Sequence, residues 1–225
     1  MKKLLTAFLL VLSLTIQPAF AEKPSEDAKL PKVLIIGDSI SLGYTPYVKN
    51  MLKDQAEVVH NRGNAGPTMR GVANIEKWLG DTPWDVIHFN WGLWDMYGWE
   101  YAKEDRSPAR YAERLEALVA RLKKTKAKLI WGTTTPACPE PEKTMLRRFK
   151  TKVVIVPQLE QQYLDAALEV MKKNKVEVND LYAVVAPELK KYSPAADDVH
   201  YTKPGYEKLG EQVAKSIEAA LKAEK

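Results

Sequence analysis

Cysteine is almost absent from this sequence: Cys138 is the only one among 225 residues. A lone cysteine cannot form an intrachain disulfide, which excludes a small scaffold held together by disulfide bonds. Histidine is also scarce: the chain has only three, and they stand far apart in the sequence. No His/Cys cluster therefore has the spacing of a metal site, and we expect a protein that needs no metal or other cofactor.

A large excess of charge of one sign is also missing. Lys and Arg number 34 against 29 Asp and Glu, a net charge of +5, and basic and acidic residues are interleaved after residue 22. Because a nucleic-acid-binding face requires clustered basic side chains, we expect no nucleic-acid partner. With 45% hydrophobic residues, 11 Gly and 14 Pro, the composition is that of an ordinary globular protein. It excludes collagen and low-complexity disorder.

Long hydrophobic runs are missing except at the N-terminus. Residues 1–21 combine a basic head at Lys2 and Lys3, an apolar run over 4–16 and a small-x-small site that ends at Ala21. This is the pattern of a secretory signal peptide. The apolar run is shorter than the ~20 residues of a membrane-spanning helix. We therefore predict cleavage after Ala21, a secreted or periplasmic protein, and no membrane anchor after cleavage.

The remaining chain is expected to consist of a flexible lead-in over 22–31 and one domain over 32–225. Short apolar runs rich in β-branched residues predict buried strands, and the amphipathic segments between them predict helices. The strands are expected at 33–36, 57–60, 85–90, 128–131 and 176–179, and the clearest helices at 41–51, 107–122, 159–173 and 204–223. This alternation predicts an α/β fold with a parallel sheet of about five strands and helices on both sides.

The first candidate for chemistry is Ser39, which follows Gly37 and Asp38 at the end of the first predicted strand. In a parallel sheet the ligand site lies outside the carboxyl ends of the strands. A serine at a strand-to-helix turn there can act as a nucleophile and also supply a backbone N–H to an oxyanion. The alternative is that Asp38 and Ser39 only cap the following helix.

The candidate base is His200, in a polar loop just before the last helix. Asp197 stands three residues earlier and can fold back to accept the Nδ1 proton, which leaves Nε2 to take the proton of Ser39. His60 and His88 lie in or at the end of apolar strands, so we expect them to be hydrogen-bonded core residues. The alternative for the Asp-x-x-His pattern is a loop with a solvated carboxylate.

The ordered blocks resemble those of the SGNH/GDSL hydrolase superfamily, from Lys32 to the last helix. Residues 37–40 (Gly-Asp-Ser-Ile) match the nucleophile block, and 197–200 (Asp-Asp-Val-His) match the acid and base block. Residues 61–68 resemble the second block, whose last glycine donates an N–H to the oxyanion hole, so the resemblance assigns Gly66. A plain turn is the alternative there. The resemblance implies a three-layer α/β/α flavodoxin-like fold and ester hydrolysis through a Ser-His-Asp triad.

The third block departs from the family pattern Gly-x-Asn-Asp. Residues 92–95 read Gly-Leu-Trp-Asp, so Trp94 stands where the family has an oxyanion-hole asparagine. Asn90 is the favoured substitute, because residues two apart in an extended chain share a face. The indole N–H of Trp94 is the other candidate donor. Asn90 can instead satisfy the backbone of its own loop, and the hole then has two donors.

The segment 89–101 is rich in aromatic residues and follows the third predicted strand. We expect Trp91 and Trp94 to contact substrate, because flat rings suit sugars or acyl chains. The alternative is a packed aromatic loop that only supports the site. The sequence thus predicts an exported serine esterase that acts on small-molecule or carbohydrate esters, including acetyl esters, through an acyl-enzyme. A catalytically silent ligand- or carbohydrate-binding module on the same scaffold is the alternative.

Overall fold

The structure is a computed structural model that describes residues 29–97, 107–140, 145–146, 151–152 and 157–223. The predicted signal peptide, most of the predicted lead-in, Trp99 and Tyr101 lie outside the described residues. None of the helices in the described part of the chain is long and apolar enough to cross a membrane.

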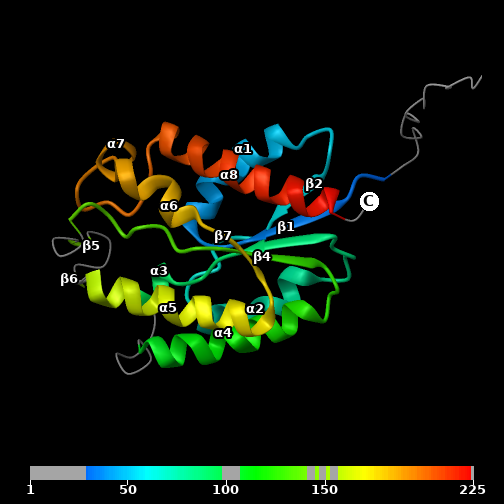
Figure 1. Ribbon diagram of the computed structural model, residues 1–225, viewed down its shortest axis with the longest axis horizontal. Helices are drawn as coiled ribbons and strands as arrows, with labels where there is room; N and C mark the ends of the chain where they lie inside the picture. Colours follow the sequence, from blue (N-terminus) through cyan, green and yellow to red (C-terminus); the bar gives the residue numbers. More distant parts are fainter. Residues whose placement is uncertain (1–28, 98–106, 141–144, 147–150, 153–156, 224–225) are drawn as a thin grey trace, which may run out of the picture.

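Five strands form a sheet at the centre of the structure (Figure 1). They are β1 (Lys32–Ile36), β2 (Glu57–His60), β3 (Val86–Phe89), β4 (Lys128–Gly132) and β7 (Glu177–Asn179). The order is β2-β1-β3-β4-β7 and every neighbouring pair is parallel, which confirms the predicted sheet. Strand β2 lies on one side of β1 and β3 on the other, so the direction in which strands are added reverses between β1 and β3. In such sheets this switch point is where ligands bind.

Two helical layers bury the sheet. On one face lie α1 (Ser39–Met51) and α8 (Lys203–Lys222), and on the other α2 (Thr68–Leu79), α4 (Pro108–Lys123) and α5 (Pro157–Asn174) (Figure 1). Because both faces are covered, Val33, Leu34, Ile35 and Ile36 of β1 are all buried. The predicted three-layer arrangement is therefore confirmed.

Short elements follow the carboxyl ends of the strands. They are α3 (Leu93–Tyr97), α6 (Leu181–Val185), a 3-10 turn (Ala186–Glu188) and α7 (Leu189–Tyr192), and the strands β5 (Met145–Leu146) and β6 (Thr151–Lys152) form a small antiparallel pair. The apolar periodicity does not single out these short elements, because each buries too few side chains to repeat a pattern.

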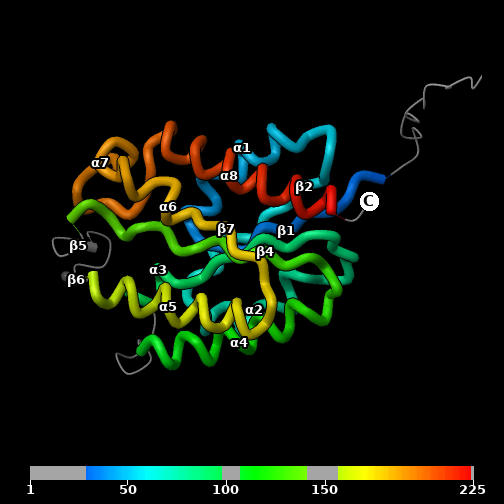
Figure 2. Tube along the Cα trace, in the orientation of Figure 1, coloured from blue at the N-terminus to red at the C-terminus, as the bar shows by residue number. Residues whose placement is uncertain are grey.

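Helices α1 and α8 lie side by side, as the trace in Figure 2 shows, although they come from opposite ends of the domain. Glycines allow this close approach. A Cβ on Gly43 would lie 2.1 Å from the ring of Tyr206, and one on Gly210 would lie 2.7 Å from Cβ of Tyr47. The packing therefore brings the start of α1 and the loop before α8 to the same edge of the sheet.

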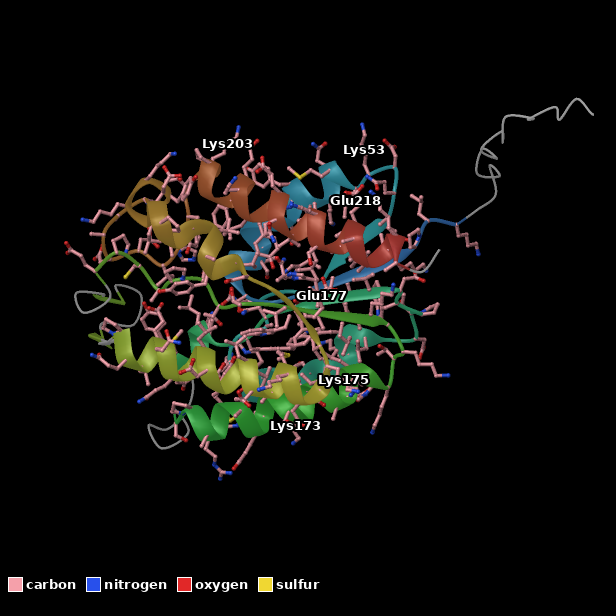
Figure 3. The ribbon with its side chains drawn as sticks, viewed as in Figure 1. Lys53, Lys173, Lys175, Glu177, Lys203 and Glu218 are labelled. Carbon is pink, nitrogen blue, oxygen red and sulfur yellow. The ribbon has the colours of Figure 1, made fainter. Side chains whose placement is uncertain are left out.

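Charged side chains lie on the outside of both layers. Figure 3 shows Lys53 and Lys203 pointing away from the sheet on the α1–α8 side, and Lys173 on the opposite side at the end of α5. All three are exposed. This is the amphipathic arrangement that the helical periodicity predicts.

His88 is a core residue, as the sequence predicts. Its side chain is fully buried in β3, and Asn179 Nδ2 lies 3.1 Å from Nε2. Burial lowers the pKa of His88 from 6.5 to about 3, so the ring is neutral. His60 is also hydrogen-bonded, because its Nδ1 lies 2.7 Å from the carbonyl oxygen of Asn61. His60 Nε2 lies 2.7 Å from Oγ of the buried Ser41, so both ring nitrogens of His60 have partners other than Ser39.

Candidate active site

Ser39 is the first residue of α1 and follows β1 through a tight turn. The carboxylate of Asp38 caps the helix by accepting the N–H of Ile40 at 2.9 Å. Asp38 therefore has the capping role that was the alternative for this pair, and the half-buried Ser39 is left to face the edge of the sheet. Burial raises the pKa of the Asp38 carboxyl, which favours its neutral form.

The loop after β2 holds this turn in place. Asn61, which is 3% exposed, accepts the N–H of Gly37 at 2.9 Å, and Ala65 donates its N–H to the carbonyl of Gly37 at the same distance. A Cβ on Gly37 would lie 2.6 Å from Ser41 Oγ, so the turn requires glycine. The nucleophile block and the second block thus form one hydrogen-bonded unit.

His200 lies next to Ser39, although 161 positions separate them in the chain. Its Nε2 is 3.1 Å from Ser39 Oγ, within the range of a hydrogen bond from a serine hydroxyl. The loop that carries His200 is fixed by the neighbouring residues. Val199 is buried, and the hydroxyl of Tyr201 donates to the carbonyl of Pro136 at 3.3 Å. The structure therefore brings the candidate nucleophile and the candidate base together.

The carboxylate beside His200 is that of Asp198, which corrects the prediction of Asp197. Asp198 Oδ1 lies 2.8 Å from His200 Nδ1 and 2.9 Å from the backbone N of His200. The reason is the turn itself, because an aspartate commonly accepts the N–H of the residue two positions later, and this brings its carboxylate to the following side chain. Asp197 is half-buried and stands one position outside that turn.

This pair is open to solvent. The side chains of His200 and Asp198 are 47% and 42% exposed. Water weakens the electrostatic attraction between exposed charges. The main effect of Asp198 is therefore to hold the proton on Nδ1 and to orient the ring, which leaves Nε2 as an acceptor towards Ser39.

Gly66 has the left-handed backbone that favours glycine, with φ +61°. Its N–H donates to Asn64 Oδ1 at 2.7 Å. The single hydrogen that the resemblance assigns to an oxyanion hole is thus taken by a side chain of the same loop. A substrate oxygen must replace Asn64 Oδ1 to use it.

Asn90 does not present its amide to a substrate, which corrects the prediction that it supplies an oxyanion donor. Its Nδ2 donates to the carbonyl of Gly132 at 2.8 Å and to Thr134 Oγ1 at 3.2 Å. A side-chain amide has two hydrogens, and both are used. Asn90 therefore links the ends of β3 and β4 by hydrogen bonds. This resembles the predicted alternative, in which Asn90 satisfies the backbone of a loop.

The two predicted substrate-binding tryptophans have different surroundings. Trp91 is 1% exposed and stacks on Trp78 with 6.4 Å between ring centroids, so it is a core residue and the prediction of a substrate contact is wrong. Trp94 is half-buried, and the guanidinium of Arg70 lies 5.3 Å from its ring centroid. Arg70 also packs against Gly66, where a Cβ would lie 2.9 Å from its Cζ. A cation is thus present beside the second block.

Asp95 is a supporting residue of the site, and the sequence pattern assigns it no role. It is fully buried and accepts the N–H of Thr68 at 3.0 Å and the hydroxyl of Thr68 at 2.5 Å. Thr68 begins α2, and the N-cap residue Pro67 provides no side-chain cap. The sequence signal that could identify such a residue is the start of α2, which has no capping side chain, because the first N–H groups of a helix need another acceptor.

No group of three metal-binding side chains occurs within the described ranges. Ser39 and His200 supply a serine hydroxyl and an imidazole within hydrogen-bonding distance, which are the groups that acyl transfer requires.

A comparison with protein families identifies one that matches most of the chain. Residues 35–208 match the model of the GDSL-like Lipase/Acylhydrolase family. No curated protein matches the sequence.

Solved structures share the fold at low sequence identity. A lipase/acylhydrolase from Enterococcus faecalis is 20% identical, with a TM-score of 0.67 over 84% of this chain and 96% of that chain. An aryl esterase from M. smegmatis is 16% identical, with a TM-score of 0.69 over 84% and 99% of the two chains. An acetyl xylan esterase, AlAXEase, is 18% identical, with a TM-score of 0.63 over 83% and 99%. The chain therefore belongs to the GDSL-like lipase/acylhydrolase family and is an ester hydrolase of the SGNH/GDSL type.

Proposed function

We propose that this protein is an exported serine esterase that removes acetyl or similarly small acyl groups from carbohydrate esters. The observation that carries the proposal is a chain of two contacts. Ser39 Oγ lies 3.1 Å from His200 Nε2, and His200 Nδ1 lies 2.8 Å from Asp198 Oδ1. Export is proposed from the signal-peptide pattern of residues 1–21.

The reaction starts at the hydroxyl of Ser39. His200 Nε2 takes the proton while Oγ attacks the ester carbonyl, and Asp198 stabilises the imidazolium that forms. The tetrahedral intermediate collapses, the C–O bond to the alcohol breaks, and His200 returns the proton to the leaving oxygen. Water then attacks the acyl-enzyme with His200 as base, which releases the acid and restores Ser39.

The oxyanion requires donors, and two backbone groups are proposed for it. The N–H of Ser39 is at the first position of α1, where a helix provides no acceptor for it. The N–H of Gly66 becomes available when the oxyanion replaces Asn64 Oδ1, because a hydrogen bond to an ionised oxygen is about twice as strong as one to a neutral amide. The N-terminal end of α1 also favours negative charge.

The carbohydrate part of the proposal has two supports. One of the proteins with this fold is an acetyl xylan esterase. In this chain, the exposed side chains of His200 and Asp198 leave room for a bulky alcohol, which a deep, closed tunnel would not. Neither support depends on the contacts of Trp91, which is buried.

The test is the hydrolysis of p-nitrophenyl acetate by the wild type, Ser39→Ala and Ser107→Ala. We expect Ser39→Ala to lower kcat by about 10⁴-fold or more, because the covalent step is lost. Ser107→Ala is the matched control: Ser107 is the exposed N-cap residue of α4, and this variant should retain the wild-type kcat. Equal rates for the wild type and Ser39→Ala would favour the silent binding module instead.

A further inference from the structure

A cavity is lined by residues of α3, α5 and α6 and of the loop after β4. Its volume is about 140 Å³, and its lining includes Thr134, Glu160, Gln161, Leu164 and Tyr182. A cavity of ~150 Å³ accommodates one six-membered ring. The space therefore suits a single ring and not an extended chain.

The loop after β4 connects this cavity to the nucleophile. Thr134 lines the cavity, and it also lines a small pocket together with Asp38 and Ile40, the two neighbours of Ser39. Two residues further along the same loop, the carbonyl of Pro136 accepts the hydroxyl of Tyr201, the residue after His200. One loop thus contacts both the surroundings of Ser39 and the cavity.

The cavity wall combines apolar surface with one acidic group. Leu164 and the half-buried Tyr182 provide the apolar surface, and Glu160 is the acidic residue of the lining. Glu160 Oε1 accepts the N–H of Ala137 at 2.8 Å, which fixes the carboxyl group and leaves Oε2 to accept from a ligand. Burial raises the pKa of Glu160, because a charge is poorly solvated there.

We propose that this cavity is a subsite for one neutral, hydroxyl-bearing ring of the alcohol part of the ester, such as a sugar. Glu160 accepts hydrogen bonds from its hydroxyl groups, and Leu164 and Tyr182 pack against its C–H faces. An acidic sugar is disfavoured, because its charge would be poorly solvated in the cavity. The inference rests on the proposed esterase function, since it assigns part of that enzyme's substrate.

The first test compares two substrates: a mono-acetylated methyl β-xyloside, which has free hydroxyls, and p-nitrophenyl acetate. We expect Glu160→Gln to lower the ratio of kcat/KM for the sugar ester over p-nitrophenyl acetate about tenfold, mainly through KM, because the group that faces the ligand changes from an acceptor oxygen to an NH₂ donor. The glutamine can still accept the N–H of Ala137, so the loop is retained. Glu169→Gln makes the same change on the exposed side of α5 and should keep the wild-type ratio.

A second variant tests the cavity without changing Glu160. Gln161 is exposed at the cavity, so Gln161→Trp should fill its mouth and lower the same ratio. An unchanged ratio in both variants would overturn the proposal. So would a Gln161→Trp protein that loses activity on p-nitrophenyl hexanoate but not on the sugar ester, because the cavity would then hold the acyl chain.

Binding is measured separately from catalysis with the Ser39→Ala protein. Calorimetry with the mono-acetylated methyl β-xyloside should detect binding that Glu160→Gln weakens about tenfold. If the wild type hydrolyses neither ester, the proposed function fails, while this binding experiment still decides on the subsite. Binding that does not change on Glu160→Gln would contradict the subsite even in an active esterase.

Discussion

Asp198→Asn is expected to lower kcat for p-nitrophenyl acetate by about 10³- to 10⁴-fold, whereas Asp197→Asn should lower it by less than about threefold. The reason is the tautomer of His200. The Asp198 carboxylate, 2.8 Å from Nδ1, accepts a hydrogen bond from Nδ1–H and so keeps Nε2 unprotonated towards Ser39. An asparagine can donate to Nδ1 instead, which moves the proton to Nε2 and removes the base. Steady-state kinetics of the two variants provides the measurement.

The two aspartates are a matched pair, because they are neighbours in the same loop and undergo the same change of one oxygen for one NH₂. KM should change little in either variant, since neither change removes a proposed contact with the substrate. Circular dichroism of both variants checks that the loop and fold are retained. The reverse order of kcat losses would show that the enzyme works with Asp197, as the sequence pattern predicts.

Asp95→Ala is expected to lower the free energy of unfolding by about 2–4 kcal/mol. The fully buried carboxylate accepts both the N–H and the hydroxyl of Thr68. Without it, two buried donors at the start of α2 lose their acceptor, and a small cavity remains. Urea unfolding followed by circular dichroism measures the loss.

Asp81→Ala is the control, because Asp81 is exposed and its loss should change the free energy of unfolding by less than about 0.5 kcal/mol. Asp95→Ala should also reduce kcat, since α2 begins two residues after Gly66. An Asp95→Ala protein as stable as Asp81→Ala would contradict the role of Asp95 as the cap of α2.

The fold was largely predictable because its strongest signals are local. The apolar run 33–36 is buried on both faces, and a short run rich in β-branched residues that ends at a glycine is typical of a central strand covered by helices on both sides. Ser39 and His200 were also predictable, because in a parallel sheet the residues that follow strand ends gather at one edge. The short helices α3 and α6 were not, since they bury too little apolar surface to leave a periodic pattern.

The details of the site depend on contacts that the sequence does not encode locally. Asp197 and Asp198 are chemically identical neighbours, and only the turn geometry decides which one reaches His200. The amide of Asn90 is occupied by the carbonyl of Gly132, a residue on another strand. Trp91 is buried because Trp78 of α2 covers it. Each of these outcomes depends on a partner distant in sequence or on the local conformation of the backbone.

The most direct test of the account is covalent labelling with a fluorophosphonate, a reagent that phosphonylates activated serine hydroxyls, followed by peptide mass spectrometry. The geometry of Ser39 and His200 predicts one adduct, on the peptide that contains Ser39, and its loss in His200→Ala. Fragment ions must place the phosphonyl group on Ser39 and not on Ser41, which is buried and shares the same peptide. An adduct on another serine, or undiminished labelling of Ser39 in His200→Ala, would contradict the account.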